Sequence, residues 1–142
     1  MEIAIIGGGH GSYAAAAHLS DDGHSVRLWR RDTEDFSAVL ASRTITMTNW
    51  QGTRPITINK PTINIAEALD GAELIVIPLP CTTHKNLSIQ IAPHLQDGQV
   101  VYIPPATFGT YIFARALQES GNPAHVTFAE TGTLPYLARK QA

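Results

Sequence analysis

The sequence predicts an α/β fold with a doubly wound, mainly parallel sheet and helices on both faces. Short apolar runs rich in β-branched residues alternate with helical patterns along the 142 residues. The run Ala72–Pro78, "AELIVIP", is almost continuously apolar, as is typical of a strand buried on both faces of a parallel sheet. Prolines 78, 80, 104 and 105 come just after predicted strands, at the edge where open α/β sheets bind ligands.

The first part of the chain predicts two strand–helix units. Glu2–Ile6 is a short β-branched run bounded by glycine, and Gly11–Leu19 contains four successive alanines, which are strong helix formers. His24–Trp29 has apolar residues at alternate positions and predicts a second strand. Asp32–Ser42 predicts a short helix, with Asp32 or Thr33 as its N-cap.

An excursion from the sheet is expected next. Residues 44–58 alternate on both sides of Gln51-Gly52, which predicts a small β-hairpin, and Ile65–Leu69 predicts a short helix. The remaining units alternate regularly. They are predicted helices at Thr82–Leu95 and Thr107–Ser120, and predicted strands at Ala72–Pro78, Gln99–Pro104 and Ala124–Glu130.

Composition bounds the class of protein. A chain with 44% hydrophobic and 15% charged residues suits one domain, expected here over residues 1–142. The net charge of −2 argues against nucleic-acid binding, and no apolar run approaches a membrane span. The single cysteine, Cys81, excludes an internal disulfide framework, so we expect a cytoplasmic protein. We expect no metal site, and both tryptophans, Trp29 and Trp50, are expected to pack.

The segment "AIIGGGHGSYAAAAHL" carries the main functional signal. Gly7, Gly9 and Ser12 occupy the key places of the pattern G-x-G-x-x-G/A, between a strand and an alanine-rich helix. The first glycine allows a tight turn, the second lets a pyrophosphate approach the backbone, and the third small residue lets the helix pack. Gly8 and Gly11 leave the turn barer still. This context predicts a Rossmann-type dinucleotide site, and no Gly-Lys-Ser/Thr follows to form a P-loop.

Two residues of this turn have open alternatives. His10 is either a contact to the pyrophosphate or a partner subunit, or an exposed loop histidine. Ser12 replaces the expected glycine or alanine, and its hydroxyl is suited either to capping the helix or to contacting a phosphate.

The residues after the second strand bear on the choice of cofactor. Enzymes that prefer NAD usually have an acid there for the ribose 2′-hydroxyl, whereas this chain has Arg30-Arg31. Arginine pairs with a 2′-phosphate and stacks on adenine, so the sequence favours NADP. Asp32 is a displaced acid that keeps NAD possible, and the alternative is a pair of solvated arginines. FAD is disfavoured, because it too usually has an acid at this position.

Three stretches together resemble the opine dehydrogenases, the octopine/nopaline dehydrogenase family. They are "IAIIGGGHGSYAAAAHLSDDGHSVRLWRR", "AELIVIPLPCTTHKNLSIQIAPHLQDGQVVYIPPATFGT" and "ETGTLPYLAR". The first stretch is shared with glycerol-3-phosphate dehydrogenase and ketopantoate reductase relatives. More specific are a V-P-x-x-x-H loop, matched by Pro80–His84, and an E-T-x-x-L-P-Y-x-x-R run, matched by Glu130–Arg139.

The resemblance implies reductive condensation of an amino acid with a 2-oxo acid, with hydride supplied by NAD(P)H. It also implies that the catalytic histidine and aspartate lie in a C-terminal helical domain, which we expect to be absent from this chain. No catalytic residue is therefore assigned here. By the same resemblance, the loops after later strands border the cofactor, and we assign to them Leu79, Pro80, His84, Pro105 and Glu130. The alternative for His84 is a histidine on the first helical turn with no chemical role, and the alternative for Glu130 is a solvated acid at the end of a strand.

Two functions from different classes follow. The first is the NADP(H)-binding domain of an opine-dehydrogenase-like oxidoreductase, inactive alone. The second is a stand-alone nicotinamide-nucleotide-binding module or sensor without catalysis. The expected partners are the dinucleotide and either a second copy in a homodimer or a separate helical catalytic domain.

Overall fold

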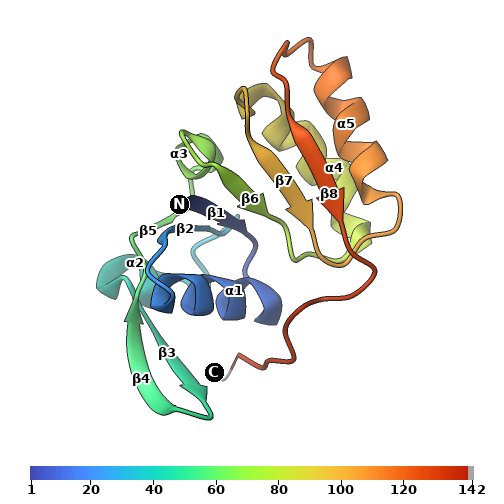
Figure 1. The fold of residues 1–142 in the computed structure, drawn as a ribbon. Coiled ribbons are helices and arrows are strands. Elements are labelled where there is room, and N and C mark those ends of the chain that lie inside the picture. The colour runs from blue at the N-terminus through green and yellow to red at the C-terminus, as the bar shows by residue number, and fades with distance from the viewer. Residues whose placement is uncertain (141–142) are drawn as a thin grey trace.

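The computed structural model describes residues 1–140, so the last two residues of the expected domain, 141–142, lie outside the described part. Figure 1 labels its elements. In chain order they are β1 (Glu2–Ile6), α1 (His10–Asp21), β2 (Ser25–Trp29), α2 (Ser37–Ser42), β3 (Thr44–Asn49), β4 (Gly52–Thr57), β5 (Lys60–Thr62), α3 (Ile65–Leu69), β6 (Leu74–Val76), α4 (Cys81–Ile91), a 3₁₀ turn (Ala92–His94), β7 (Val100–Ile103), α5 (Gly109–Glu119) and β8 (Thr127–Glu130).

Six strands form one sheet in the order β5-β2-β1-β6-β7-β8, and every adjacent pair is parallel. The first strand, β1, lies in the interior of this sheet. The strands β2 and β5 follow on one side of it, and β6, β7 and β8 follow on the other side. Ile3 is therefore paired with Val26 on one side and with Leu74 on the other. The predicted doubly wound fold is confirmed, and its order reverses between β1 and β6, which is where such folds bind ligands.

Alternate residues of β1 serve two cores on opposite faces of the sheet. Ile3 and Ile5 belong to a buried cluster with the α1 residues Tyr13, Ala15 and Ala16. Ala4 and Ile6 belong to the other cluster, which α3, α4 and α5 complete. Each buried isoleucine contributes about 2 kcal/mol relative to an exposed one. In Figure 1, α1 crosses the β1–β2 side, while α4 and α5 lie together beside β7 and β8.

The strand β5 was not predicted. Lys60–Thr62 pairs with β2, Arg27 opposite Lys60, and extends the sheet at its edge. Its three residues follow the alternating hairpin sequence directly, so the pattern gives no separate signal. Pro61 is compatible with this position because an edge strand leaves one side of its backbone unpaired.

Several predicted elements are shorter than expected, among them the strand predicted over Ala72–Pro78, of which β6 comprises only Leu74–Val76. The helix over residues 32–42 is wrong in its first half, because Asp35 has a left-handed backbone (φ 54°) and α2 begins only at Ser37. The α4 helix ends at Ile91 and tightens into the 3₁₀ turn, since Pro93 has no N–H to continue the α-helical pattern. β8 begins at Thr127 because side chains, not a neighbouring strand, accept the preceding amides: Ala124 N–H bonds Asn122 Oδ1, and His125 N–H bonds Asp97 Oδ1.

The predicted hairpin is confirmed as β3 and β4, an antiparallel pair in which Asn49 faces Gly52. Arg54 ties it to α1 through an ion pair with Asp21. The expectation that Trp50 packs is wrong: it lies at the hairpin tip and is 90% exposed. Trp29, by contrast, is buried, and its indole N–H donates to the Ile63 carbonyl at 3.0 Å.

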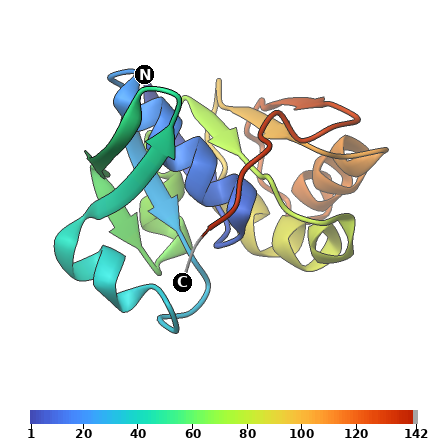
Figure 2. The ribbon, with the colours of Figure 1, turned by 90° about the horizontal axis from the view of Figure 1, so that it is seen from below.

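After β8 the chain turns back over α1, and Figure 2 shows this tail running beside the helix. Leu134 packs against Gly11, the Tyr136 ring meets the His18 ring edge-on, and Lys140 lies over the Tyr13 ring. Over residues 1–140 none of the helices combines the length and apolar character needed to cross a bilayer. The same residues contain no group of three His, Cys, Asp or Glu side chains placed to hold a metal.

Candidate functional site

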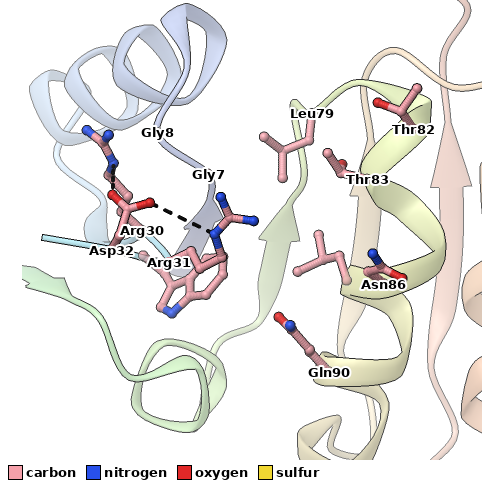
Figure 3. Close-up of a pocket in the computed structure, with 12 residues that line it drawn as sticks. Gly7, Gly8, Arg30, Arg31, Asp32, Leu79, Thr82, Thr83, Asn86 and Gln90 are labelled. Carbon is pink, nitrogen blue, oxygen red and sulfur yellow. Dashed lines mark ion pairs between the residues drawn. The ribbon is translucent and has the colours of Figure 1, made fainter. Parts of the chain in front are cut away.

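A cleft of about 360 Å³ opens at the carboxyl edge of the sheet. Figure 3 shows the glycine turn and the end of β2 on one side of it, and the loop after β6 with the polar face of α4 on the other. The lining residues are Gly7, Gly8, Trp29, Arg30, Arg31, Asp32, Leu79, Thr82, Thr83, Asn86, Leu87 and Gln90.

The cleft brings together five of the residues assigned from the sequence: Gly7, Gly8, Arg30, Arg31 and Leu79. Sequence reasoning missed the wall formed by α4. The residues Thr82, Thr83, Asn86 and Gln90 recur at helical spacing, so a polar face on this helix was readable. What was not readable is that this face turns toward Arg30 and Arg31, which follow β2, and not toward solvent alone.

Three glycines of the turn are closely packed against other parts of the chain. A Cβ on Gly7, whose φ is +131°, would lie 2.6 Å from both Leu79 Cδ2 and Ser12 Oγ. A Cβ on Gly8 would lie 2.7 Å from Arg30 Cδ. A Cβ on Gly11 would lie 3.1 Å from Leu134, and this residue therefore accommodates the tail.

Gly9 differs from these three. A Cβ built there meets nothing within 4 Å among the described residues, and its φ of −84° suits any amino acid. Nothing in the packing of residues 1–140 therefore requires a glycine at this position.

The N-terminus of α1 opens beside Gly9. Gly9 is the N-cap and its carbonyl accepts the Tyr13 N–H at 3.1 Å, but among residues 1–140 no side chain caps the first amides, and no acid lies in the first turn. The alternative that Ser12 caps the helix is wrong. Its hydroxyl is fully buried, lies against Gly7 and has no hydrogen-bond partner. A helix start with unsatisfied amides and a positive dipole end favours an anion.

Arg30 and Arg31 play different parts in the cleft. Arg30 is only 18% exposed, packs along Gly8, and directs Nε to Asp32 Oδ1 at 3.2 Å. Its Nη1 is buried and has no hydrogen-bond partner in the described part of the chain. Arg31 is 81% exposed and approaches the other Asp32 oxygen at 3.9 Å. Arg30 is thus a fixed wall of the cleft, whereas Arg31 is a surface cation beside it (Figure 3).

The loop after β6 places Leu79, Pro80 and His84 at different depths. Leu79 reaches the cleft, and Pro80 is the N-cap residue of α4. The His84 ring is completely buried below them, with Nε2 3.0 Å from the Leu79 carbonyl and its plane nearly edge-on to Phe113. Nδ1 has no partner. His84 does not line the cleft. It supports the loop from beneath by bonding the carbonyl of Leu79, which does line it.

Pro105 and Glu130 form a separate group at the ends of β7 and β8. The Glu130 carboxylate accepts the backbone N–H groups of Phe108 at 2.9 Å and Thr110 at 2.8 Å. The hydrogen bond from the Thr110 amide is the main reason that the pKa of Glu130 is lowered, and the Phe108 amide adds to it. His10 lies apart from both groups: it is exposed, and its Nδ1 accepts the Lys140 N–H at 2.8 Å.

A family model described as the N-terminus of NAD-dependent glycerol-3-phosphate dehydrogenase matches residues 2–104. The chain belongs to this family. The match includes the glycine turn, the arginines after β2 and the α4 wall, so this dehydrogenase domain contains every residue that lines the cleft.

Relatives extend the likeness along the rest of the chain. An opine dehydrogenase from Arthrobacter sp. (strain 1C) is 29% identical over 139 residues, which is 97% of this chain and 38% of that enzyme. A glycerol-3-phosphate dehydrogenase [NAD(P)+] from Koribacter versatilis (strain Ellin345) is 35% identical over 99 residues, 69% of this chain and 29% of that enzyme. Octopine dehydrogenase, solved with NADH and L-arginine, superposes with a TM-score of 0.81 at 19% identity, covering all of this chain and 38% of that one.

The resemblance to opine dehydrogenases drawn from the sequence is confirmed. The chain is a nucleotide-binding domain of the NAD(P)-dependent opine and glycerol-3-phosphate dehydrogenase class, with a Rossmann-type fold. It spans less than two fifths of the length of these relatives.

Proposed function

We propose that the chain binds NADP(H) across the carboxyl edge of its sheet as the cofactor domain of an opine-dehydrogenase-like oxidoreductase. The observation that carries this proposal is Gly9. Three neighbouring glycines lie against other parts of the chain, whereas a Cβ on Gly9, at the start of α1, would meet nothing within 4 Å among residues 1–140. A pyrophosphate at that point accounts for the missing side chain, because it would lie on the backbone and on the positive end of the helix.

The adenosine half of the cofactor fits the cleft beside Arg30. The guanidinium plane of Arg30 is suited to stacking on adenine, and its buried Nη1 lacks a partner that a ribose phosphate would supply. Arg31, exposed at the rim, adds a second cation for a 2′-phosphate.

NAD is the second candidate, and Asp32 favours it. This carboxylate already forms ion pairs with both arginines. A bound 2′-phosphate would have to displace it from them or lie close to a second negative charge. The same carboxylate is suited to accept a hydrogen bond from a ribose hydroxyl. We propose NADP because two cations outweigh one acid at this position.

The bound nicotinamide would supply hydride to reduce the imine formed from an amino acid and a 2-oxo acid. The residues of this chain would bind and orient the cofactor: the amides of α1 hold the pyrophosphate, Arg30 holds the adenosine half, and Leu79 closes the cleft over Gly7. We assign no general acid or base among the described residues. We therefore propose that turnover requires a helical catalytic domain, as a partner or as part of a longer chain.

A titration calorimeter tests the proposal with NADPH and NADH in separate runs. The proposal predicts binding of both, with NADPH tighter, and a loss of affinity in Arg30→Ala that is larger for NADPH than for NADH. Equal affinity for both cofactors in the wild type, unchanged in Arg30→Ala, would contradict the NADP assignment. An assay with NADPH, pyruvate and an amino acid separates the oxidoreductase domain from a binding module, once a helical partner is supplied.

A further inference from the structure

Phe108 is an exposed aromatic residue with a strained backbone. Its φ of 58° and ψ of 19° lie in the left-handed region, which residues with a Cβ rarely adopt. Burial does not offset this strain, because the side chain is 77% exposed. A bulky residue held in this conformation at a surface is a signal of function more than of packing.

The surrounding chain holds Phe108 in place. Glu130 accepts its N–H and that of Thr110, and the Thr131 carbonyl accepts the Ala106 N–H at 2.8 Å. Gly109 is packed so closely that a Cβ there would lie 2.7 Å from Ala106 Cβ. The conformation of Phe108 is therefore fixed from both sides and does not need to be induced by a ligand.

The position of Phe108 relates it to the far end of the cofactor. The Arg30 cleft lies at the end of β2, the start of α1 follows β1, and Phe108 follows β7. The sheet order β2-β1-β6-β7 separates the first and last of these by three strand spacings, or about 14 Å. An extended dinucleotide with its adenosine in the cleft and its pyrophosphate on α1 has its nicotinamide half on the β6–β7 side.

We propose that Phe108 contacts the nicotinamide half of the bound dinucleotide and fixes the position of its ring. This inference rests on the proposed function and adds a residue to it. The aromatic face offers a flat apolar surface to the nicotinamide ring, and the rigid loop places that surface before the cofactor arrives. The adenosine half, held in the cleft, is independent of Phe108.

The experiment compares ligands with and without nicotinamide. The 142-residue chain and its Phe108→Ala variant are titrated with NADPH and with 2′-phospho-ADP-ribose, and again with NADH and ADP-ribose. We expect Phe108→Ala to bind the two intact dinucleotides about three- to tenfold more weakly. Binding of the two ADP-ribose ligands should stay unchanged.

Three further variants serve as controls. Tyr111→Ala removes another exposed aromatic side chain, 63% exposed and three residues along, and should change no affinity. Phe108→Tyr keeps the ring and should restore dinucleotide binding. Phe108→Gly relieves the left-handed strain, so it should fold at least as stably as the wild type while binding as weakly as Phe108→Ala.

The outcomes separate this inference from the proposed function. An equal loss for intact and truncated ligands, or no loss for either, would overturn the assignment of Phe108, as would wild-type affinities that do not depend on the nicotinamide. Failure of the wild type to bind even the ADP-ribose ligands would overturn the proposed function as well. Selective loss of the intact dinucleotides, with rescue by tyrosine, supports the contact.

Discussion

The side chain of Arg30 lies against the α-carbon of Gly8, so close that a Cβ at position 8 would stand 2.7 Å from Arg30 Cδ. This contact joins the glycine turn to the residue that follows β2, and it makes one wall of the cleft from two loops that are far apart in the sequence. The glycine at position 8 thus determines where the arginine stands.

Replacing Gly8 with alanine should displace Arg30 and break its ion pair with Asp32. Because Arg30 is proposed to hold the adenosine half, we expect NADPH to bind several-fold more weakly while the fold remains intact. Calorimetry measures the affinity and thermal unfolding the stability. Unchanged NADPH affinity in Gly8→Ala would show that the position of Arg30 does not matter for binding.

The two arginines should respond unequally to substitution. Arg30→Ala removes a packed wall of the cleft and should weaken both cofactors, NADPH more than NADH. Arg31→Ala removes an exposed cation, so it should weaken only NADPH and by a smaller factor. Asp32→Asn removes the competing charge and should raise the ratio of NADPH to NADH affinity. A loss of NADH affinity in the same variant would instead support the NAD assignment, because the Asp32 carboxylate would then be the acceptor for the ribose hydroxyl.

Glu130→Gln should reduce stability in a pH-dependent way. Its pKa is lower in the folded protein than in the unfolded chain, so its carboxylate stabilises the fold above the unfolded pKa of about 4.3. This contribution is lost as the pH falls through the folded pKa. At pH 7 the variant should lose about 1 kcal/mol, as for the loss of a helix cap.

Urea unfolding of both proteins at pH 7 and at pH 3 measures this difference. The gap between wild type and Glu130→Gln should narrow at the lower pH, where the wild-type carboxyl is increasingly protonated. A gap that is the same at both pH values would show that the charge of Glu130 does not stabilise the turn at Phe108.

His84→Leu should destabilise the fold by about 1–3 kcal/mol, because it leaves the buried Leu79 carbonyl without a donor. Leu79 packs on Gly7, so the variant should also weaken dinucleotide binding. The exposed His94 provides a matched control, and His94→Leu should change neither property. Equal stability of the two variants in chemical unfolding would argue against a supporting role for His84.

The sequence predicts the parts of this fold that have strong local patterns. The apolar runs of β1, β6 and β7, the alanines of α1 and the Gln51-Gly52 turn each predict their element without tertiary information. β5 was missed because its three residues are a strand only through pairing with β2. Trp50 was wrongly expected to pack, because a large apolar residue in an alternating sequence gives no signal of whether it lies at the exposed tip of a hairpin or on a buried face.

The residues of the site likewise fall into those that a local motif predicts and those that only the folded chain brings together. The glycine turn and Arg30-Arg31 are contiguous motifs, and Gly7 and Gly8 of the turn line the cleft together with both arginines. Three other features join residues far apart in the chain: the polar face of α4 turns toward Arg30-Arg31, Glu130 accepts the Phe108 N–H, and Leu134 packs on Gly11. No local pattern encodes these contacts, because they depend on the order of the strands in the sheet.

Gly9→Val tests the central claim most directly, since a Cβ at position 9 meets nothing within 4 Å among residues 1–140 and a valine there would occupy the surface on which a pyrophosphate would lie. Calorimetric titration with NADPH is run on the wild type and on this variant, with thermal unfolding to confirm that both are folded. We predict that the wild type binds and that Gly9→Val, with a melting temperature close to that of the wild type, does not. Normal NADPH binding by a folded Gly9→Val would contradict the assignment of the pyrophosphate to this turn.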